Sequence, residues 1–134
     1  MRSTRRVAAL AGLIALCSVP VAAEAHPTGH FDACLTRADA GFCDDTFSYI
    51  FGDTVVLRGT VSEDHARAIV LVRPPRSGAW ERWARIPISD AGRMTFRWRT
   101  HRSDADQRRP YLLRFEIPGH GQSDVVRAFV LFGE

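Results

Sequence analysis

Four histidines are the side chains in this chain best suited to chemistry. His26 and His30 lie in VAAEAHPTGH, His65 ends the turn SEDH, and His120 lies in the loop PGHGQSD. A chain that begins at His26 offers its α-amine and its imidazole together, and nitrogen ligands suit Cu(II). These residues therefore predict a copper site in which His26 is joined by His30, His65 or His120. The alternative is that all four are solvated, with His26 merely the residue that processing leaves first.

The first 25 residues explain why His26 can begin the mature chain. MRSTRRVAALAGLIALCSVPVAAEA has three arginines, an apolar run over residues 7–19 and an A-x-A cleavage site at 23–25. This is the pattern of a secretory signal peptide (residues 1–25) with cleavage before His26. The apolar run is shorter than the roughly 20 residues that a membrane-spanning helix needs. We therefore expect a secreted, periplasmic or cell-envelope protein without a membrane span after cleavage.

The loop HGQSD has the residue types of a hydrolase but not their arrangement. His120, Ser123 and Asp124 lie within five residues, whereas a catalytic triad needs a base bonded to the nucleophile and a third group that orients the base. Ser123 is not in a G-x-S-x-G turn. The acidic pairs at 44–45 and 63–64 supply neither a calcium ligand series nor two carboxylates at a defined separation. We expect no catalytic residues and no enzyme activity.

Arginines and a tryptophan form a second candidate binding surface. Arg97 and Arg99 alternate with apolar residues in RMTFRWR, Arg109 follows in the next loop, and Trp83 is expected to be exposed. Guanidinium groups bind carboxylates and phosphates. This set predicts a ligand face for an anionic envelope polymer or for a protein partner. A solvated charged face that prevents edge-to-edge strand pairing would explain the same residues.

The charge balance argues against nucleic acid as a partner. Without the signal peptide, 109 of the 134 residues remain, with 15 arginines, no lysine and 14 acidic residues. The mature net charge is then only about +1, because most of the basic excess belongs to the signal peptide. A chain of this length has the usual size of one domain. We expect a monomer that binds no nucleic acid.

Two cysteines remain after cleavage, Cys34 and Cys43 in CLTRADAGFC. An even number of cysteines in an exported protein predicts a disulfide bond, which would contribute about 2.5–3 kcal/mol to stability. Two cysteines without CxxC or HxxxH companions make a poor zinc site. We expect residues 26–45 to form an N-terminal segment held by this disulfide, with at most a turn or two of helix in DACLTRADAG.

The remaining sequence alternates between apolar and polar residues in short runs that turn residues separate, which is typical of strands. In RMTFRWR, Met94, Phe96 and Trp98 share one face, which we expect to be buried. Strands are expected at residues 46–51, 54–61, 66–73, 79–88, 93–99, 111–117 and 125–132. About seven strands in this arrangement predict an all-β antiparallel sandwich over residues 46–134.

The runs FGDTVVLRGTV, SGAWERWARIPISDAGRMTFRW and PYLLRFEIPGHGQSDVVRAFV resemble, in this order, the Ig-like domains of bacterial secreted and cell-surface proteins. The resemblance implies an Ig-like sandwich with Trp80 in its core, acting as a spacer, an adhesion unit or a binding module. It also implies that loops 62–65, 89–92 and 118–124 meet at one end, near the start of the first strand. His65 and His120 would then lie at that end and His101 at the other.

Overall fold

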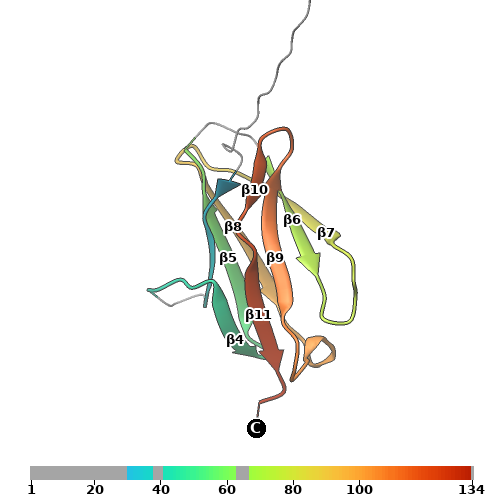
Figure 1. Ribbon diagram of the computed structural model, residues 1–134. Coiled ribbons are helices and arrows are strands. Elements are labelled where there is room, and N and C mark those ends of the chain that lie inside the picture. Colours follow the sequence, from blue (N-terminus) through green and yellow to red (C-terminus); the bar gives the residue numbers. More distant parts are fainter. Residues whose placement is uncertain (1–29, 38–40, 63–66, 134) are drawn as a thin grey trace, which may run out of the picture.

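The computed structural model describes residues 30–37, 41–62 and 67–133, and within them the protein is all-β. The predicted signal peptide, His26 and His65 lie outside these residues. The described part contains no α-helix, only a single 3-10 turn, and no helix that could cross a membrane. The strands (Figure 1) are β2 (His30–Phe31), β3 (Ala33–Thr36), β4 (Thr46–Ile50), β5 (Thr54–Thr60), β6 (Arg67–Arg73), β7 (Glu81–Pro87), β8 (Arg93–Arg99), β9 (Tyr111–Ile117), β10 (Gly121–Ser123) and β11 (Val126–Leu131).

The strands form a three-stranded sheet, β3-β5-β8, and a seven-stranded sheet around β9. In the larger sheet β9 has β6 on one side, followed by β7, and β10 and β11 on the other. β2 then lies along β10 and β4 along β11 (Figure 1). The seven expected strands are all present, but the expectation of antiparallel pairing throughout is wrong. β2 and β4 run parallel to their partners, because alternation predicts which residues are buried and not the direction of the neighbouring strand.

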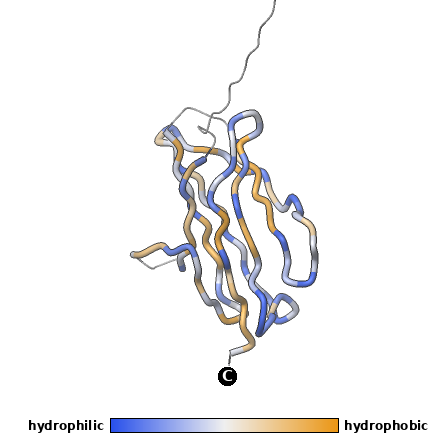
Figure 2. Tube along the Cα trace, viewed as in Figure 1, coloured by the Kyte–Doolittle hydropathy of each residue, from blue (hydrophilic) through white to orange (hydrophobic). Residues whose placement is uncertain are grey.

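One apolar core lies between the sheets and takes alternate residues from each strand. Val55 and Leu57 of β5 face Val70, Leu113 and Phe115 of the larger sheet, and all are fully buried. Figure 2 shows hydrophobic and hydrophilic positions alternating along the central strands. The predicted phase is therefore confirmed for β4, β5, β8, β9 and β11, in which alternate residues were expected to face one core.

The segment before Thr46 is more ordered than its sequence suggests. Instead of a helical turn in DACLTRADAG, the chain forms β3, which pairs with β5. Leu35 of β3 is fully buried and exchanges backbone hydrogen bonds of 2.6 and 2.8 Å with Asp44. The predicted disulfide between Cys34 and Cys43 joins the two sides of this turn, with Cα atoms 5.3 Å apart. Burial of the alternate residues of β3 therefore anchors the segment, and the disulfide closes it.

The expected positions of two tryptophans are wrong: both are half-buried, but Trp83 packs against the core and Trp80 does not. Ala84 of β7 lies opposite Val70 and Arg82 lies opposite Leu71, so Trp83 is the extra residue of a β-bulge. The bulge turns Trp83 inward, where it packs against the core and meets the Trp98 ring edge-on at a centroid distance of 4.9 Å. Trp80 precedes β7 and lies outside the core, with the Arg114 guanidinium 4.3 Å from its ring centroid. Simple alternation could not predict the bulge, since nothing in the spacing marks it.

The turn between β7 and β8 is tied to the end of β5 through Gly92. The backbone has a φ of +79° at this residue, and its carbonyl accepts a 2.8 Å hydrogen bond from the Val61 N–H. A Cβ atom at this position would collide with the Val61 carbonyl oxygen. Gly52 has a φ of +98° with open space around it, so it has the same backbone conformation without the close contact.

We expect Gly92→Ala to lower the free energy of unfolding by at least about 2 kcal/mol more than Gly52→Ala. Both substitutions place a side chain in the left-handed region, which costs roughly 1–2 kcal/mol, but only Gly92→Ala also forces two backbone segments apart. Chemical denaturation of the two variants and the parent measures the difference. Equal losses would show that the turn is not held against β5 as described.

Both tyrosines of the chain are buried and bonded to backbone carbonyls. The Tyr49 hydroxyl donates to Thr36 at 2.8 Å, and the Tyr111 hydroxyl donates to Asp104 at 2.7 Å. Burial raises the pKa of Tyr111 to about 12, with the nearby Asp104 and Asp106 carboxylates adding to the effect. Burial likewise raises the pKa of Tyr49 well above its usual range.

We therefore expect the folded protein to show little phenolate absorbance up to about pH 11, whereas the chain unfolded in guanidinium chloride titrates near pH 10. The folded state holds both phenolic protons more tightly than the unfolded state. Their contribution to stability is complete below about pH 10 and is lost as the pH rises from there through the folded-state pKa values. Tyr111→Phe leaves Tyr49 as the single reporter. If a tyrosine of the folded protein titrated near pH 10, that tyrosine would not be buried as described.

Candidate functional site

The outer face of the larger sheet carries a group of arginines that we call the arginine face. On β6, Ala68, Val70 and Val72 face the core, so the residues between them point outward. Residues directly opposite each other on neighbouring strands share a face. The register therefore places the following residues on the outer face: Arg67, Arg73, Arg82, Arg85, Arg114 and Arg127.

The arginine face has little negative charge to balance it. Glu116 of β9 lies on it, opposite Ile69. Within the described part of the chain, arginine–carboxylate ion pairs involve Arg37 and Arg76, and no residue of the arginine face. Ile69 and Leu71 lie between the arginines, and Ile69 is only 5% exposed. Long arginine side chains cover such residues with their stems and keep their charged ends in water, so the face presents mainly guanidinium groups.

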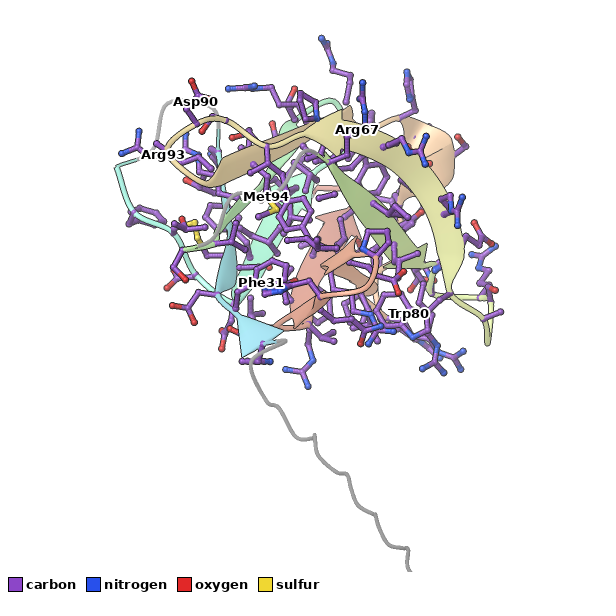
Figure 3. The ribbon with its side chains drawn as sticks, turned by 90° about the horizontal axis from the view of Figure 1, so that it is seen from above. Phe31, Arg67, Trp80, Asp90, Arg93 and Met94 are labelled. Carbon is purple, nitrogen blue, oxygen red and sulfur yellow. A yellow bond between two sulfur atoms is a disulfide. The ribbon has the colours of Figure 1, made fainter. Side chains whose placement is uncertain are left out.

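Trp80 and Arg114 give this face a fixed element. The Arg114 guanidinium stacks over the Trp80 ring at 4.3 Å, a favourable cation–π geometry. The Arg114 Nε is buried and has no hydrogen-bond acceptor among the described residues. Figure 3 labels Arg67 and Trp80, which lie toward opposite ends of the side on which β6 and β7 run. The terminal nitrogens of Arg114 are thus held at a defined place beside an aromatic ring.

The residues predicted as a ligand face are distributed over several parts of the fold. Arg97 and Arg99 are exposed on β8, on the outer side of the three-stranded sheet. Arg109 is exposed in the loop before β9, where its backbone N–H donates to Asp106 at 2.9 Å. This bond and the matching one from Arg108 lower the pKa of Asp106. Trp83 packs inward, as described above, so the structure does not place it beside the exposed guanidinium groups.

Two of the predicted copper ligands come together at one end of the molecule. His30 and His120 both line an open pocket of about 530 Å³, together with Ser62. The Nε2 of His30 lies 2.5 Å from an Asp124 carboxylate oxygen. Among residues 30–37, 41–62 and 67–133 no group of three potential ligands is close enough to hold a metal ion. His101 precedes the 3-10 turn at the opposite end (Figure 1), as expected.

Ser123 has a structural role. Its Oγ accepts a 2.9 Å hydrogen bond from the Phe115 N–H and donates a 2.9 Å hydrogen bond to the Asp124 carbonyl. Its side chain is 4% exposed. With its proton already donated to a backbone carbonyl, Ser123 bonds the backbone of β9 and is not set up as a nucleophile.

Sequence reasoning found the charged strand β8 and missed the arginine face. In β8, arginine alternates with bulky apolar residues, whereas on the larger sheet each strand contributes only one or two arginines from separate parts of the sequence. The available signal was the phase of two strands, which already placed Arg114 and Arg127 outward, whereas the side of Arg82 depends on the bulge at Trp83. Only the strand order shows that these residues share one surface.

Comparison with known proteins adds no identification. The sequence matches no protein-family model, and no curated protein is similar to it. A function for this protein therefore has to be inferred from the geometry of its surfaces.

Proposed function

We propose that this protein is an exported, non-catalytic Ig-like module that binds an anionic polymer of the cell envelope through the arginine face. The observation that carries the proposal is the gathering of six arginines and one glutamate on the outer side of a single sheet. A guanidinium group without a carboxylate partner is available to bind a carboxylate or phosphate from outside.

The strand order supports the Ig-like assignment. Chain connections pass between the sheets from β5 to β6 and again from β8 to β9, and β4 joins the larger sheet beside the last strand, β11. This is the order expected for a Greek-key sandwich whose first strand is divided between two sheets. Such a fold offers broad sheet faces for binding. The function depends on the residues that those faces carry and not on the fold itself.

The spacing of the arginines suits an extended polymer better than a small ion. Strands lie about 4.8 Å apart and residues on one face of a strand recur about every 6.8 Å. Arg82, Arg114 and Arg127 therefore lie on three different strands across the width of the sheet. Arg67 and Arg73 lie at the two ends of β6, so the arginine face also extends along the strands. Many weak charge contacts over such a distance would bind a repeating anion, and salt would weaken them.

The first test compares two triple variants with the same change in charge. We expect Arg82→Gln, Arg85→Gln and Arg114→Gln together to weaken binding to a polycarboxylate such as polygalacturonate by at least tenfold at low salt. The control is Arg97→Gln, Arg99→Gln and Arg109→Gln, which removes three charges from other surfaces and should weaken binding less than threefold. Neutral dextran should bind neither the variants nor the parent.

Affinity chromatography or calorimetry at several salt concentrations measures both variants. A larger loss in the control would move the ligand face to β8 and overturn the proposal for the arginine face. Equal losses of affinity in the two triple variants would show that binding depends only on the net charge of the protein, not on the arginine face. If both triple variants bound the polymer as tightly as the parent, the proposal that arginines bind the polymer would be contradicted.

Copper binding is a second candidate, favoured by the shared pocket of His30 and His120. The Asp124 carboxylate can bind one ring nitrogen of His30, so that the other ring nitrogen can bind a metal ion. This arrangement is common around metal-binding histidines. The mature amino terminus at His26 would supply the remaining nitrogens.

For this candidate we expect His120→Ala to weaken Cu(II) binding by at least tenfold, measured by competition with a chelator on the protein processed by exporting cells. His101→Ala, at the opposite end, is the matched control and should change nothing. Native mass spectrometry of the same samples reports the first residue and the bound ion. A chain that starts elsewhere than His26, or one that loses its copper to the chelator, would exclude this function.

A further inference from the structure

A second basic site lies on the three-stranded sheet, beside the disulfide. An open pocket of about 420 Å³ is lined by residues of β3, β5 and β8 and by Cys34 and Cys43. Arg58 of β5 lies between Cys34 on β3 and Thr95 on β8. Arg93 of β8 lies one step further along the sheet. The volume is within the range of small-molecule sites.

Two guanidinium groups of this pocket are free to meet a ligand. Arg58 is directly opposite Thr95, so Arg58 and Arg93 are diagonal neighbours, at about 7–8 Å between their backbones. Arginine side chains are long enough to converge across that distance. Neither residue forms an ion pair with a carboxylate in the described part of the chain. The Thr95 hydroxyl on the same face adds a hydrogen-bond donor.

The rest of the pocket lining limits the kind of anion that fits. The Cys34–Cys43 disulfide provides an apolar wall next to the arginines, whereas the side chains of Ala33 and Met94 are buried and face the core. Figure 3 shows Arg93 pointing away from the core while Met94 points into it. Asp32 also lines the pocket, and its negative charge opposes a ligand with several charges. These features suit one anionic head group attached to a small apolar body.

We propose that this pocket binds a small organic anion with a single head group, its carboxylate or phosphate held by Arg58 and Arg93 and its apolar part against the disulfide wall. The site is independent of the polymer proposal, because its residues lie on the other sheet from the arginine face. The disulfide has a direct role here, since it forms one side of the pocket.

The test uses hexanoate and hexyl phosphate as probes, with hexanamide as a neutral ligand of similar size. Amide chemical shifts of the uniformly labelled mature protein are followed by NMR during titration. We expect both anions to shift the amides of residues 58–60 and 93–95 in a saturable manner, and hexanamide to shift them at least tenfold more weakly. The relative affinities of the two anions identify the preferred head group.

Arg93→Gln is the first variant, because Arg93 is exposed and its loss should leave the fold intact. We expect it to weaken binding of the preferred anion at least tenfold, whereas Arg99→Gln on the same strand, outside the pocket, should change it less than twofold. Unchanged binding in Arg93→Gln, equal binding of hexanamide, or shifts confined to other residues would each overturn the proposal. An unaltered spectrum of free Arg93→Gln confirms that the variant is folded.

Discussion

The contact between Phe115 and the backbone of β5 sets the distance between the two sheets. A Cβ atom at Gly59 would lie 2.9 Å from the Phe115 ring and 3.3 Å from the Met94 side chain, so the ring occupies the space that a side chain at Gly59 would need. Phe115 is fully buried on the central strand of the larger sheet. The sheets can close at this distance because one side of the contact has no side chain.

Once the core takes alternate residues from each strand, the residues between them must face water. In this protein those residues are often arginine, and the chain contains no lysine. The two outer faces consequently both carry guanidinium groups but differ in their surroundings. The larger sheet spreads its arginines over four strands, with an aromatic ring beside one of them. The smaller sheet places two of them in a pocket with an apolar wall.

The N-terminal segment contributes residues to the core and to two of the candidate sites. Leu35 is anchored in the core, Cys34 beside it faces outward, and the disulfide to Cys43 then stands at the edge of the three-stranded sheet. The same segment places His30 of β2 against β10, where it meets Asp124 and shares a pocket with His120. A short stretch of chain thus contributes to a cavity on one face and to the histidine cluster at one end.

The sequence by itself determined the class of the fold, every strand from Thr46 onward except β10, the buried side of β4, β5, β8, β9 and β11, and the disulfide. These follow from local patterns: period-2 alternation, turn residues, and a cysteine pair in an exported chain. Such information is contained in neighbouring residues, so it can be read without the fold.

Tertiary structure alone decided the parallel pairing of β4 with β11, the strand β3, the bulge at Trp83 and the membership of the arginine face. Strand direction and register depend on contacts between residues far apart in the chain, and alternation is the same for either direction. A bulge shifts the phase by one residue without a marker in the sequence. Arg82, Arg114 and Arg127 become neighbours only when three distant strands are placed side by side, because their proximity is a property of the sheet.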